Sequence, residues 1–396
     1  MIELSPENRQ FIEDHENEDI RTLALKAKKY PHINMQMAVQ QIAGRRIAKV
    51  KIPSWYSHRE IIYPPHLSME QCSSEQTARY KASLSVGNSI IDLTGGFGVD
   101  FSFMAQGKKE AYYVESQEHL VKLASSNFEA LELNHVNVIH NNGIDYLKSD
   151  NRIWDTIYID PARRDGSGHK TVLIEDCTPN LTETDGLLND KARQVIIKLS
   201  PMLDITHATN SLSNITDIHI VSVGNECKEL IFIKNHSGKE TELHCVNITK
   251  NDIGIFSFTK QKEYNASVTY ADQPEQYLYE PNSSILKAGC YKFVGEHFEL
   301  KKLHINSHLY TSDKYLPKFP GRHFKVKRTF GANKKEMKLH LTMQQANIST
   351  RNYPESVAGI RKQTKLKEGG NDYIFATTLA NEKKVLILCE KVGSDF

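Results

Sequence analysis

The sequence predicts an α/β protein with a seven-stranded, mostly parallel sheet, an N-terminal helical region before it and small α+β C-terminal domains after it. Three observations lead to this prediction. Short apolar runs alternate with amphipathic segments over residues 76–240, a pattern typical of parallel strands joined by helices. Helix-period patterns dominate residues 1–75, and residues 241–396 combine strand-rich sequence with a strongly basic segment.

The length and composition limit the number of domains and the class of protein. A chain of 396 residues is too long for one compact core, so we expect four parts, residues 1–75, 76–240, 241–321 and 322–396. The six cysteines are scattered, without a CxxC pair or metal-ligand spacing, which favours reduced thiols in a cytoplasmic protein and no metal site. No apolar run approaches the roughly 20 residues that span a bilayer, and the acidic N-terminus is unlike a signal peptide.

The first part of the chain carries helix signals. Ser5-Pro6-Glu7 predicts a helix start, because a hydroxyl caps the first turn and proline suits the first helical position. Helix-period patterns continue through Thr22–Tyr30 and Met35–Ile47, and Pro64-Pro65 interrupts them. We interpret residues 1–75 as a helical cap or substrate-side domain.

Seven strands are predicted for the central sheet: Ser89–Leu93, Ala111–Glu115, Val136–His140, Thr156–Asp160, Gln194–Leu199, Ile218–Val223 and Leu230–Lys234. The last two follow each other closely, which predicts a hairpin at one edge of the sheet. Beyond them, two loops, a basic helix and two final strands are expected at Asn282–Ser284, Lys314–Pro320, Asn333–Gln345, Tyr373–Leu379 and Lys384–Cys389.

The strongest local signal is DLTGGFGVD, from Asp92 to Asp100, directly after the first strand and opening a helix. Glycines there let the backbone approach a ligand closely and turn tightly into a helix whose N–H groups face that ligand. A dinucleotide site requires GxGxxG, but Phe101 stands where the third glycine is needed. A ligand without a pyrophosphate is therefore favoured, and a turn without any ligand is the alternative.

Acidic residues follow the next two strands. Glu115 ends the second strand, where an acid can accept hydrogen bonds from both ribose hydroxyls of a nucleoside. Asp145, in NNGID after the third strand, could accept the exocyclic amine of an adenine. Since ligands bind at the carboxyl edge of such sheets, we expect the glycine loop and both acids to share one site.

The order DLTGGFGVD, YYVE, NNGIDYL and IYIDPARRD resembles the motif series of class I S-adenosylmethionine-dependent methyltransferases. FPGRHFKVKRTFG, ANISTRNYP and GGNDYIFATTL resemble the C-terminal THUMP-like domain of a bacterial subfamily, in which a small ferredoxin-like module commonly comes before it. The resemblance covers residues 70–394 and implies a Rossmann-like seven-stranded methyltransferase sheet with S-adenosylmethionine as cofactor. The implied cofactor residues are Asp92, Thr94, Gly95, Gly96, Gly98, Glu115, Asp145 and Asp160, with methyl transfer near Asp160.

The stretch Asp160-Pro161-Ala162-Arg163 resembles the loop with which nucleic-acid methyltransferases hold their target. The acid or adjacent carbonyls accept hydrogen bonds from an amine, and proline stiffens the turn. Asp160, Pro161 and Arg163 are therefore the catalytic candidates. Arg163 replaces the expected aromatic residue; a guanidinium can stack on a base or clamp a phosphate. We expect Arg163 and Arg164 to meet the substrate; the alternative is a solvated loop charge or a salt bridge to Asp165 or Glu175.

Other residues narrow the chemistry. The fifth strand is followed by Ser200, where carbon methylation by covalent catalysis would need cysteine, so nitrogen is the expected acceptor. Lys198 either faces the site or caps the strand end. Arg79 either meets the cofactor carboxylate or lies on a surface helix.

The segment from Lys314 to Lys367 carries fourteen Lys and Arg against two acids, about +12, while the whole chain is at +2. Such asymmetry suits a polyanion such as RNA. The candidate RNA-binding residues are Arg164, Lys327, Arg328, Arg351, Arg361 and Lys362. The leading hypothesis is methylation of a base nitrogen in structured RNA, rRNA or tRNA. The alternatives are a methyltransferase acting on a protein or small molecule, and a non-catalytic RNA-binding factor.

Overall fold

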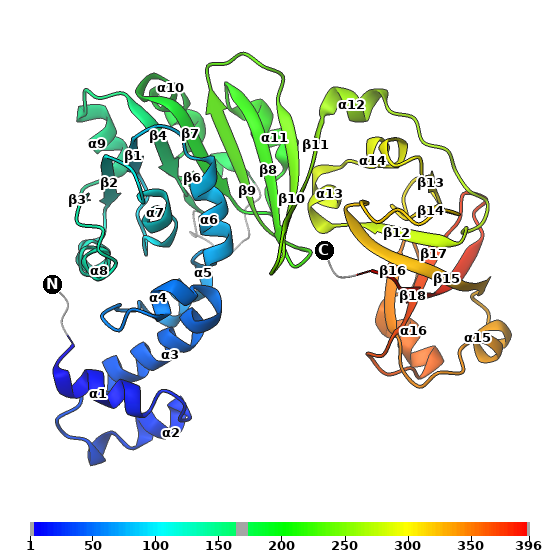
Figure 1. The fold of residues 1–396 in the computed structure, drawn as a ribbon, viewed down its shortest axis with the longest axis horizontal. Helices are drawn as coiled ribbons and strands as arrows, with labels where there is room; N and C mark the ends of the chain where they lie inside the picture. Colours follow the sequence, from blue (N-terminus) through cyan, green and yellow to red (C-terminus); the bar gives the residue numbers. More distant parts are fainter. Residues whose placement is uncertain (1–3, 164–172, 394–396) are drawn as a thin grey trace. The chain divides into compact units, whose positions relative to one another are not determined.

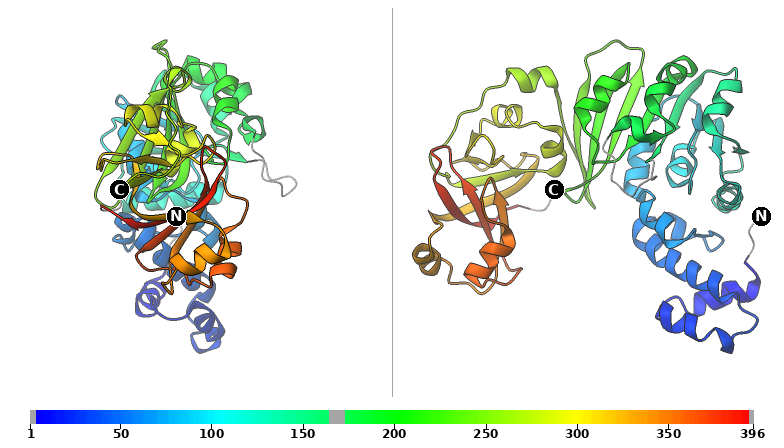
Figure 2. Two further views of the ribbon diagram at one scale, coloured as in Figure 1. Left: turned by 90° about the vertical axis from the view of Figure 1, so that its right-hand side faces the viewer. Right: turned by 180° about the vertical axis from the view of Figure 1, so that it is seen from behind.

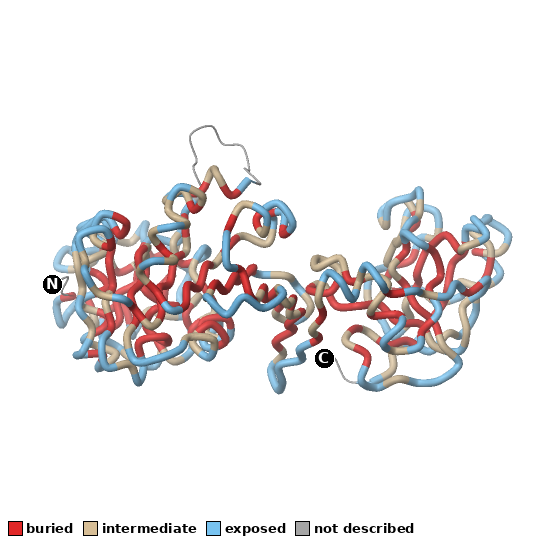
Figure 3. The backbone as a smooth tube through the Cα atoms, turned by 90° about the horizontal axis from the view of Figure 1, so that it is seen from above, coloured by how far each residue is buried: buried red, intermediate tan, exposed pale blue. Residues whose placement is uncertain are grey.

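The computed structural model describes residues 4–163 and 173–393 (Figure 1). The chain forms two compact units: Met1–Thr216 with Leu230–Lys239, and Asp217–Glu229 with Glu240–Phe396. Figure 3 colours the chain by burial, with the buried residues of each unit in red.

The first unit begins with helices, blue in Figures 1 and 2. They are α1 (Pro6–Asp14), α2 (Ile20–Leu25), the 3-10 turn η1 (Ala27–Lys29), α3 (Met35–Lys51), α4 (Pro53–Tyr56), α5 (His66–Gln71) and α6 (Glu75–Leu84). Ser5 caps α1 as predicted, because its Oγ accepts a hydrogen bond from the Asn8 amide at 3.2 Å. The helix predicted over Thr22–Tyr30 is instead the short α2 followed by η1.

The helix α3 packs against the helices before it. Its Met35, Ala38 and Ile42 share a core with Phe11 of α1 and Leu23 of α2. Its Gln41 side chain exchanges two hydrogen bonds with the Tyr63 backbone, at 2.8 and 2.9 Å. These bonds satisfy a buried amide and fix the extended stretch that leads to α5.

The sheet of the first unit has the strand order β9-β7-β4-β1-β2-β3. Its strands are β1 (Ser89–Asp92), β2 (Glu110–Glu115), β3 (Val136–His140), β4 (Trp154–Ile159), β7 (Ala192–Leu199) and β9 (Glu226–Asn235). All neighbours are parallel except β9, which runs antiparallel to β7. The predicted α/β fold with a mostly parallel sheet is confirmed.

Helices connect these strands: α7 (Val99–Met104), α8 (Glu118–Ala130), α9 (Gly143–Ser149), α10 (Leu181–Lys191) and α11 (Ile205–Ser211). After β4, the two-residue strands β5 (Ala162–Arg163) and β6 (Cys177–Thr178) pair antiparallel, and η2 (Ile174–Asp176) precedes β6. Each parallel crossover contains a helix, as the alternating sequence pattern predicts.

The predicted hairpin is present, but its first strand is not an edge strand, because a further strand pairs with it on the other side. Gly224 and Asn225, both with positive φ, make the turn between β8 (Ile215–Val223) and β9. In the second unit β8 pairs parallel with β10 (Glu242–Ile248), which pairs antiparallel with β11 (Ile253–Thr259). The edge assignment was wrong because local sequence pattern marks a strand without revealing its pairing partner.

The second unit also holds a seven-stranded sheet of order β13-β14-β12-β15-β18-β17-β16. Its strands are β12 (Tyr277–Pro281), β13 (Lys301–Lys302), β14 (Tyr310–Ser312), β15 (Gly321–Gly331), β16 (Asn347–Arg351), β17 (Asp372–Thr378) and β18 (Lys384–Lys391). The helices are α12 (Lys260–Asn265), α13 (Ser283–Ala288), α14 (Phe293–His297), α15 (Lys334–His340) and α16 (Val357–Thr364). Met337 of α15 and Ile360 of α16 pack in one core with β17 and β18.

One predicted loop is a helix start. Asn282 caps α13, because its Oδ1 accepts a hydrogen bond from the Ile285 amide at 3.2 Å, and Ser283 and Ser284 form the first turn. Asn and Ser favour helix caps as well as loops, so the run Asn282–Ser284 is ambiguous in sequence. The stretch Lys314–Pro320 contains no helix or strand, as predicted.

Candidate active site

The glycine loop lies between β1 and α7. Gly96 and Gly98 have φ of 63° and 83°, a backbone conformation that glycine adopts without strain. Gly95 has a different reason: a Cβ there would lie 2.4 Å from Cζ of Tyr113 in β2. The loop therefore lies flat against the second strand, and its glycines are required by geometry.

Glu115 at the end of β2 is fixed by this loop. One carboxylate oxygen accepts a hydrogen bond from the Gly96 amide at 2.8 Å, and the other accepts one from the Gln117 amide at 2.8 Å. The side chain is buried. A carboxylate held in this way keeps a defined orientation beside the glycine loop.

Thr94 connects the loop to the end of β4. Its amide and hydroxyl donate to Asp92 Oδ1 at 2.9 and 3.2 Å, and its hydroxyl accepts a hydrogen bond from the Asp160 amide at 2.7 Å. The predicted residues at the ends of β1 and β4 are thus in direct contact through one hydroxyl group.

Asp92 is buried, only 2% exposed. Burial, together with the nearby carboxylates of Asp160 and Asp100, raises the pKa of Asp92 to about 8, against the hydrogen bonds from Thr94. The carboxyl group is therefore mostly protonated at neutral pH. A cationic ligand beside it would favour loss of this proton.

A buried charge network lies beneath the loop. Asp100 in α7 accepts hydrogen bonds from Ser73 Oγ and Tyr158 Oη, both at 2.8 Å, and its oxygens lie 3.1 Å from Lys81 Nζ and 3.5 Å from Lys198 Nζ. Burial raises the pKa of Asp100, but the two ammonium groups and two hydroxyls outweigh it and lower the pKa to about 2. This carboxylate is charged at every pH at which the protein is expected to work.

Lys198 extends the network to Asp160. Its ammonium lies 2.6 Å from Asp160 Oδ2, and its side chain is mostly buried while that of Asp160 is 40% exposed. Of the two orientations that the sequence left open for Lys198, the structure has the one facing the site. Asp160 thus presents a carboxylate to solvent while a lysine holds it from below.

The remaining predicted residues of this edge differ in their surroundings. Asp145 lies in the first turn of α9 with an exposed side chain, 3.7 Å from Lys148. Pro161 is buried. Arg163 pairs through its backbone with Cys177, but its side chain and the whole of Arg164 lie outside the described residues.

Arg79 lies on the exposed side of α6. Its guanidinium lies 2.6 Å from Glu75 one turn earlier and over the ring of Phe103. This is the surface-helix alternative of the two that the sequence left open.

The candidate RNA-binding residues divide into two groups. Three are engaged internally: Lys327 with Asp372 at 3.0 Å, Arg351 with Glu280 at 2.7 Å, and Arg361 with the Ala346 and Leu366 carbonyls. Two face solvent, Arg328, which contacts His340 Nδ1 at 2.8 Å, and Lys362.

Exposed lysines on α15, at positions 334, 335 and 338, add to the solvent-facing positive charge. They lie near Lys362 in the fold, because α15 and α16 pack on the same core.

Sequence reasoning missed Lys81, Asp100, Ser73 and Tyr158 as members of the site. Only Asp100 had a local signal, since it ends the DLTGGFGVD motif. Lys81 lies one helix before the motif and carries no pattern of its own.

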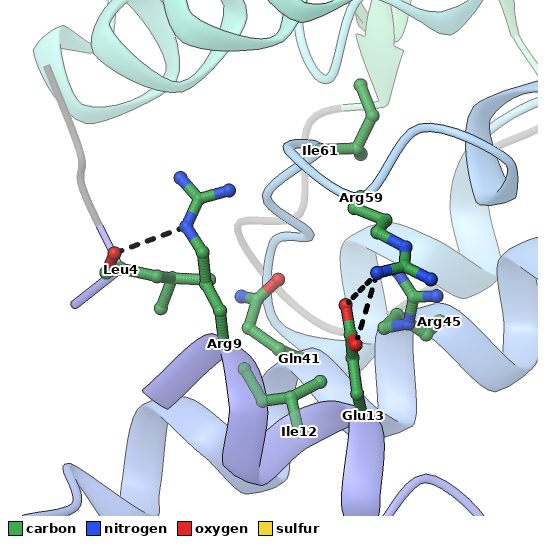
Figure 4. A pocket seen from close by; sticks show the side chains of 8 residues that line it. All are labelled: Leu4, Arg9, Ile12, Glu13, Gln41, Arg45, Arg59 and Ile61. Atoms are coloured by element: carbon green, nitrogen blue, oxygen red, sulfur yellow. Dashed lines mark hydrogen bonds and ion pairs between the residues drawn. The ribbon is translucent and has the colours of Figure 1, made fainter. Parts of the chain in front are cut away.

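A separate pocket lies among the N-terminal helices (Figure 4). It is lined by Leu4, Arg9, Ile12, Glu13, Gln41, Arg45, Arg59 and Ile61. Arg59 pairs with Glu13 at 3.2 Å, and Arg9 donates to the Leu4 carbonyl. None of these residues belongs to the glycine loop or the acids around it.

Known proteins resemble the whole chain and its C-terminal part. A crystal structure of a candidate methyltransferase from Porphyromonas gingivalis W83 is 30% identical, covers 99% of this chain and 100% of its own, and has a TM-score of 0.87. Residues 321–391 match the THUMP domain-like family, and residues 277–320 match a ferredoxin-like domain. The chain belongs to the same methyltransferase family as the Porphyromonas gingivalis protein and carries a THUMP-like domain in its C-terminal part.

A curated relative, an uncharacterized RNA methyltransferase of Mycoplasma mobile, is 32% identical over 81 residues. That match covers 20% of this methyltransferase and 22% of the relative, so the chain spans about a fifth of the relative's length. Within residues 4–163 and 173–393, every helix is too short or too polar to cross a lipid bilayer.

Proposed function

We propose that this methyltransferase transfers a methyl group from S-adenosylmethionine to a nitrogen of a base in structured RNA. The observation that carries the proposal is the contact made by Thr94, which joins Asp92 of the glycine loop to the backbone of Asp160. A loop suited to the cofactor and an acid suited to an amine are thereby brought together at one sheet edge.

The residues of this edge fit the cofactor. Asp92, Thr94, Gly95, Gly96, Gly98, Glu115 and Asp145 would hold it, with Glu115 accepting hydrogen bonds from the ribose hydroxyls and Asp145 from the adenine amine. Glu115 already accepts hydrogen bonds from two backbone amides, and these hold its carboxylate in a fixed orientation. When bound, S-adenosylmethionine supplies an electrophilic methyl group on a positively charged sulfonium.

The chain's own residues would position the acceptor. Asp160, partly exposed, accepts a hydrogen bond from the N–H of the target base and so aims the nitrogen lone pair at the methyl carbon. Lys198 holds the Asp160 carboxylate in place through their contact at 2.6 Å. Pro161 stiffens the turn, and Arg163 and Arg164 would meet the base or its phosphate.

RNA is supported as the substrate by two observations. The THUMP-like match covers the basic part of the chain, and the relative from Mycoplasma mobile is described as an RNA methyltransferase. Solvent-facing lysines on α15 and α16 are free to reach phosphates, whereas Arg351 and Arg361 are engaged internally. Among the candidates we therefore assign RNA contact first to Lys362 and Arg328, together with the α15 lysines.

Reversing two of these charges tests the substrate class. In the double variant Lys338→Glu, Lys362→Glu we expect the KM for RNA to rise about tenfold or more, and the slope of log affinity against log salt to fall by about 2. The affinity for S-adenosylmethionine should not change. The measurement is transfer of labelled methyl groups to RNA from cells lacking the gene, at several salt concentrations.

The matched control is the double variant Lys250→Glu, Lys260→Glu. It reverses the charge of two exposed lysines in the same unit that lie outside the THUMP-like match. Equal effects of the two double variants would contradict a specific RNA surface. Unchanged transfer in the first variant would favour a protein or small-molecule substrate.

The pKa of Asp92 gives a second expectation. Since bound S-adenosylmethionine adds positive charge beside this carboxyl, cofactor binding should release its proton and tighten about tenfold as the pH rises from about 6.5 to 8.5. S-adenosylhomocysteine lacks the sulfonium charge and should show a smaller effect. Calorimetry at several pH values measures both.

Asp92→Asn should remove the difference in pH dependence between the affinities for S-adenosylmethionine and S-adenosylhomocysteine. The stability of the unliganded protein should change with pH in the opposite direction. Because the pKa of Asp92 is raised to about 8, the protein loses stability as the pH rises from about 4 to 8. At pH 8, Asp92→Asn should therefore unfold at a higher denaturant concentration than the parent chain. An unchanged ligand difference in this variant would remove Asp92 from the cofactor site.

A further inference from the structure

A second cluster of chemically active side chains lies in the second unit, on β8 and β10. The parallel register sets Asp217 opposite Glu242 and His219 opposite His244. Because side chains two residues apart point to the same face of a strand, all four lie on one face of the pair. The sequence around each strand reads acid-x-His, D-I-H and E-L-H.

Three of these residues bring ligand atoms close together. His244 Nε2 lies 3.1 Å from Asp217 Oδ1 and 3.9 Å from Glu242 Oε2, and one atom from each residue lies within 4.8 Å of the others. Around a metal ion with bonds of about 2.1 Å, neighbouring ligand atoms are about 3.0–3.4 Å apart. The Glu242 side chain is 38% exposed, against 16% for Asp217 and His244, so it is the least confined of the three ligands.

The two carboxylates of this face are placed to share one cation. Asp217 and Glu242 lie directly opposite each other on paired strands, and one oxygen from each lies within 4.8 Å of His244 Nε2. A divalent ion at this point would bind all three groups at once.

The surroundings of His244 orient it for metal binding. Its Nδ1 lies 2.8 Å from Ser257 Oγ on β11, so an Nδ1–H donated to this hydroxyl leaves the Nε2 lone pair facing both carboxylates. The ring also stacks on His219, with centroids 4.4 Å apart and planes 19° from parallel. Metal-binding histidines are held in this way by a hydrogen bond on the second ring nitrogen.

We propose that Asp217, Glu242 and His244 bind one divalent transition-metal ion such as Zn²⁺, with Ser257 and His219 positioning the imidazole. One imidazole and two carboxylates suit Zn²⁺, and three protein ligands leave a coordination position for water. The cysteine spacings, which predict no metal site, do not bear on these ligands. The proposed ion links β8 to β10 and is independent of methyl transfer.

The test uses the full chain, purified without a histidine tag and stripped with a chelator. Titration with ZnCl₂ in a calorimeter should show one ion bound per chain at this site. His244→Gln, Asp217→Asn and Glu242→Gln should each weaken or remove binding, and Ser257→Ala should weaken it about tenfold. Co²⁺ in place of Zn²⁺ should give visible absorption bands that the same variants abolish.

The matched control is His66→Gln, which removes a histidine 3.7 Å from a single carboxylate, Glu70, on α5. This variant should bind Zn²⁺ like the parent chain. Equal binding by the parent and by Glu242→Gln and Ser257→Ala would overturn the proposal and leave His244 as a partner of the two carboxylates without a metal ion. If His244→Gln does not fold, Glu242→Gln, which changes a partly exposed side chain, decides the question.

Discussion

Replacement of Asp160 by alanine is expected to lower kcat for methyl transfer at least about 100-fold and to leave the affinity for S-adenosylmethionine within about threefold. Asp160 is the acid that faces solvent at the end of β4, and only its backbone amide contacts Thr94 of the cofactor loop. The substitution therefore removes the acceptor of the amine without removing a contact of the glycine loop.

The structure also limits the collateral effect of this substitution. Lys198 loses Asp160 but keeps Asp100, whose carboxylate lies 3.5 Å from its ammonium, so no buried charge is left alone. Single-turnover transfer and calorimetric cofactor binding together form the measurement. Turnover near that of the parent chain would contradict the role of Asp160, and lost cofactor binding would move it to the cofactor site.

Replacement of Lys81 by methionine is expected to destabilise the first unit by about 3 kcal/mol. The Lys81 side chain is fully buried with its ammonium 3.1 Å from Asp100. Without it, Asp100 is a buried carboxylate whose remaining partners are Lys198 and two hydroxyls. Both tryptophans of the chain, Trp55 and Trp154, are buried in this unit, so urea unfolding followed by tryptophan fluorescence reports on it directly.

The pH dependence and a second variant make this prediction specific. Because the pKa of Asp100 is lowered to about 2, its contribution to stability is present above about pH 4 and is lost as pH falls toward 2. In Lys81→Met the pKa of Asp100 should be lowered less, so this contribution should be smaller and its loss should be complete at a higher pH. The double variant Lys81→Met, Asp100→Asn should regain most of the lost stability. A double variant as unstable as Lys81→Met would show that the lost stability does not come from the unpaired charge of Asp100.

Much of the cofactor edge could be predicted from the sequence because its signals are local. Asp92, the glycines and Glu115 each stand at the end of an apolar run, and parallel strands bring such ends to one edge. The structure adds the reason for Gly95, which is the ring of Tyr113 beneath it. The fold class followed from the same alternation of strands and helices.

Contacts between distant positions could not be predicted in this way. Lys81 meets Asp100, and Lys198 meets Asp160, through the packing of α6 on α7 and of β7 on β4. Likewise, counting charges identifies a basic segment but does not show that Arg351 and Arg361 are engaged within the fold. The cluster of Asp217, Glu242 and His244 depends on the register of β8 and β10, which no local pattern encodes.

The central claim, methylation of a base nitrogen in RNA, is tested most directly by mass spectrometry of nucleosides from total RNA with and without the gene. We predict that one N-methylated nucleoside is lost in the deletion strain. It should return with the intact gene and not with Asp160→Ala. An unchanged set of modified nucleosides, or loss of a carbon-methylated base instead, would contradict the account.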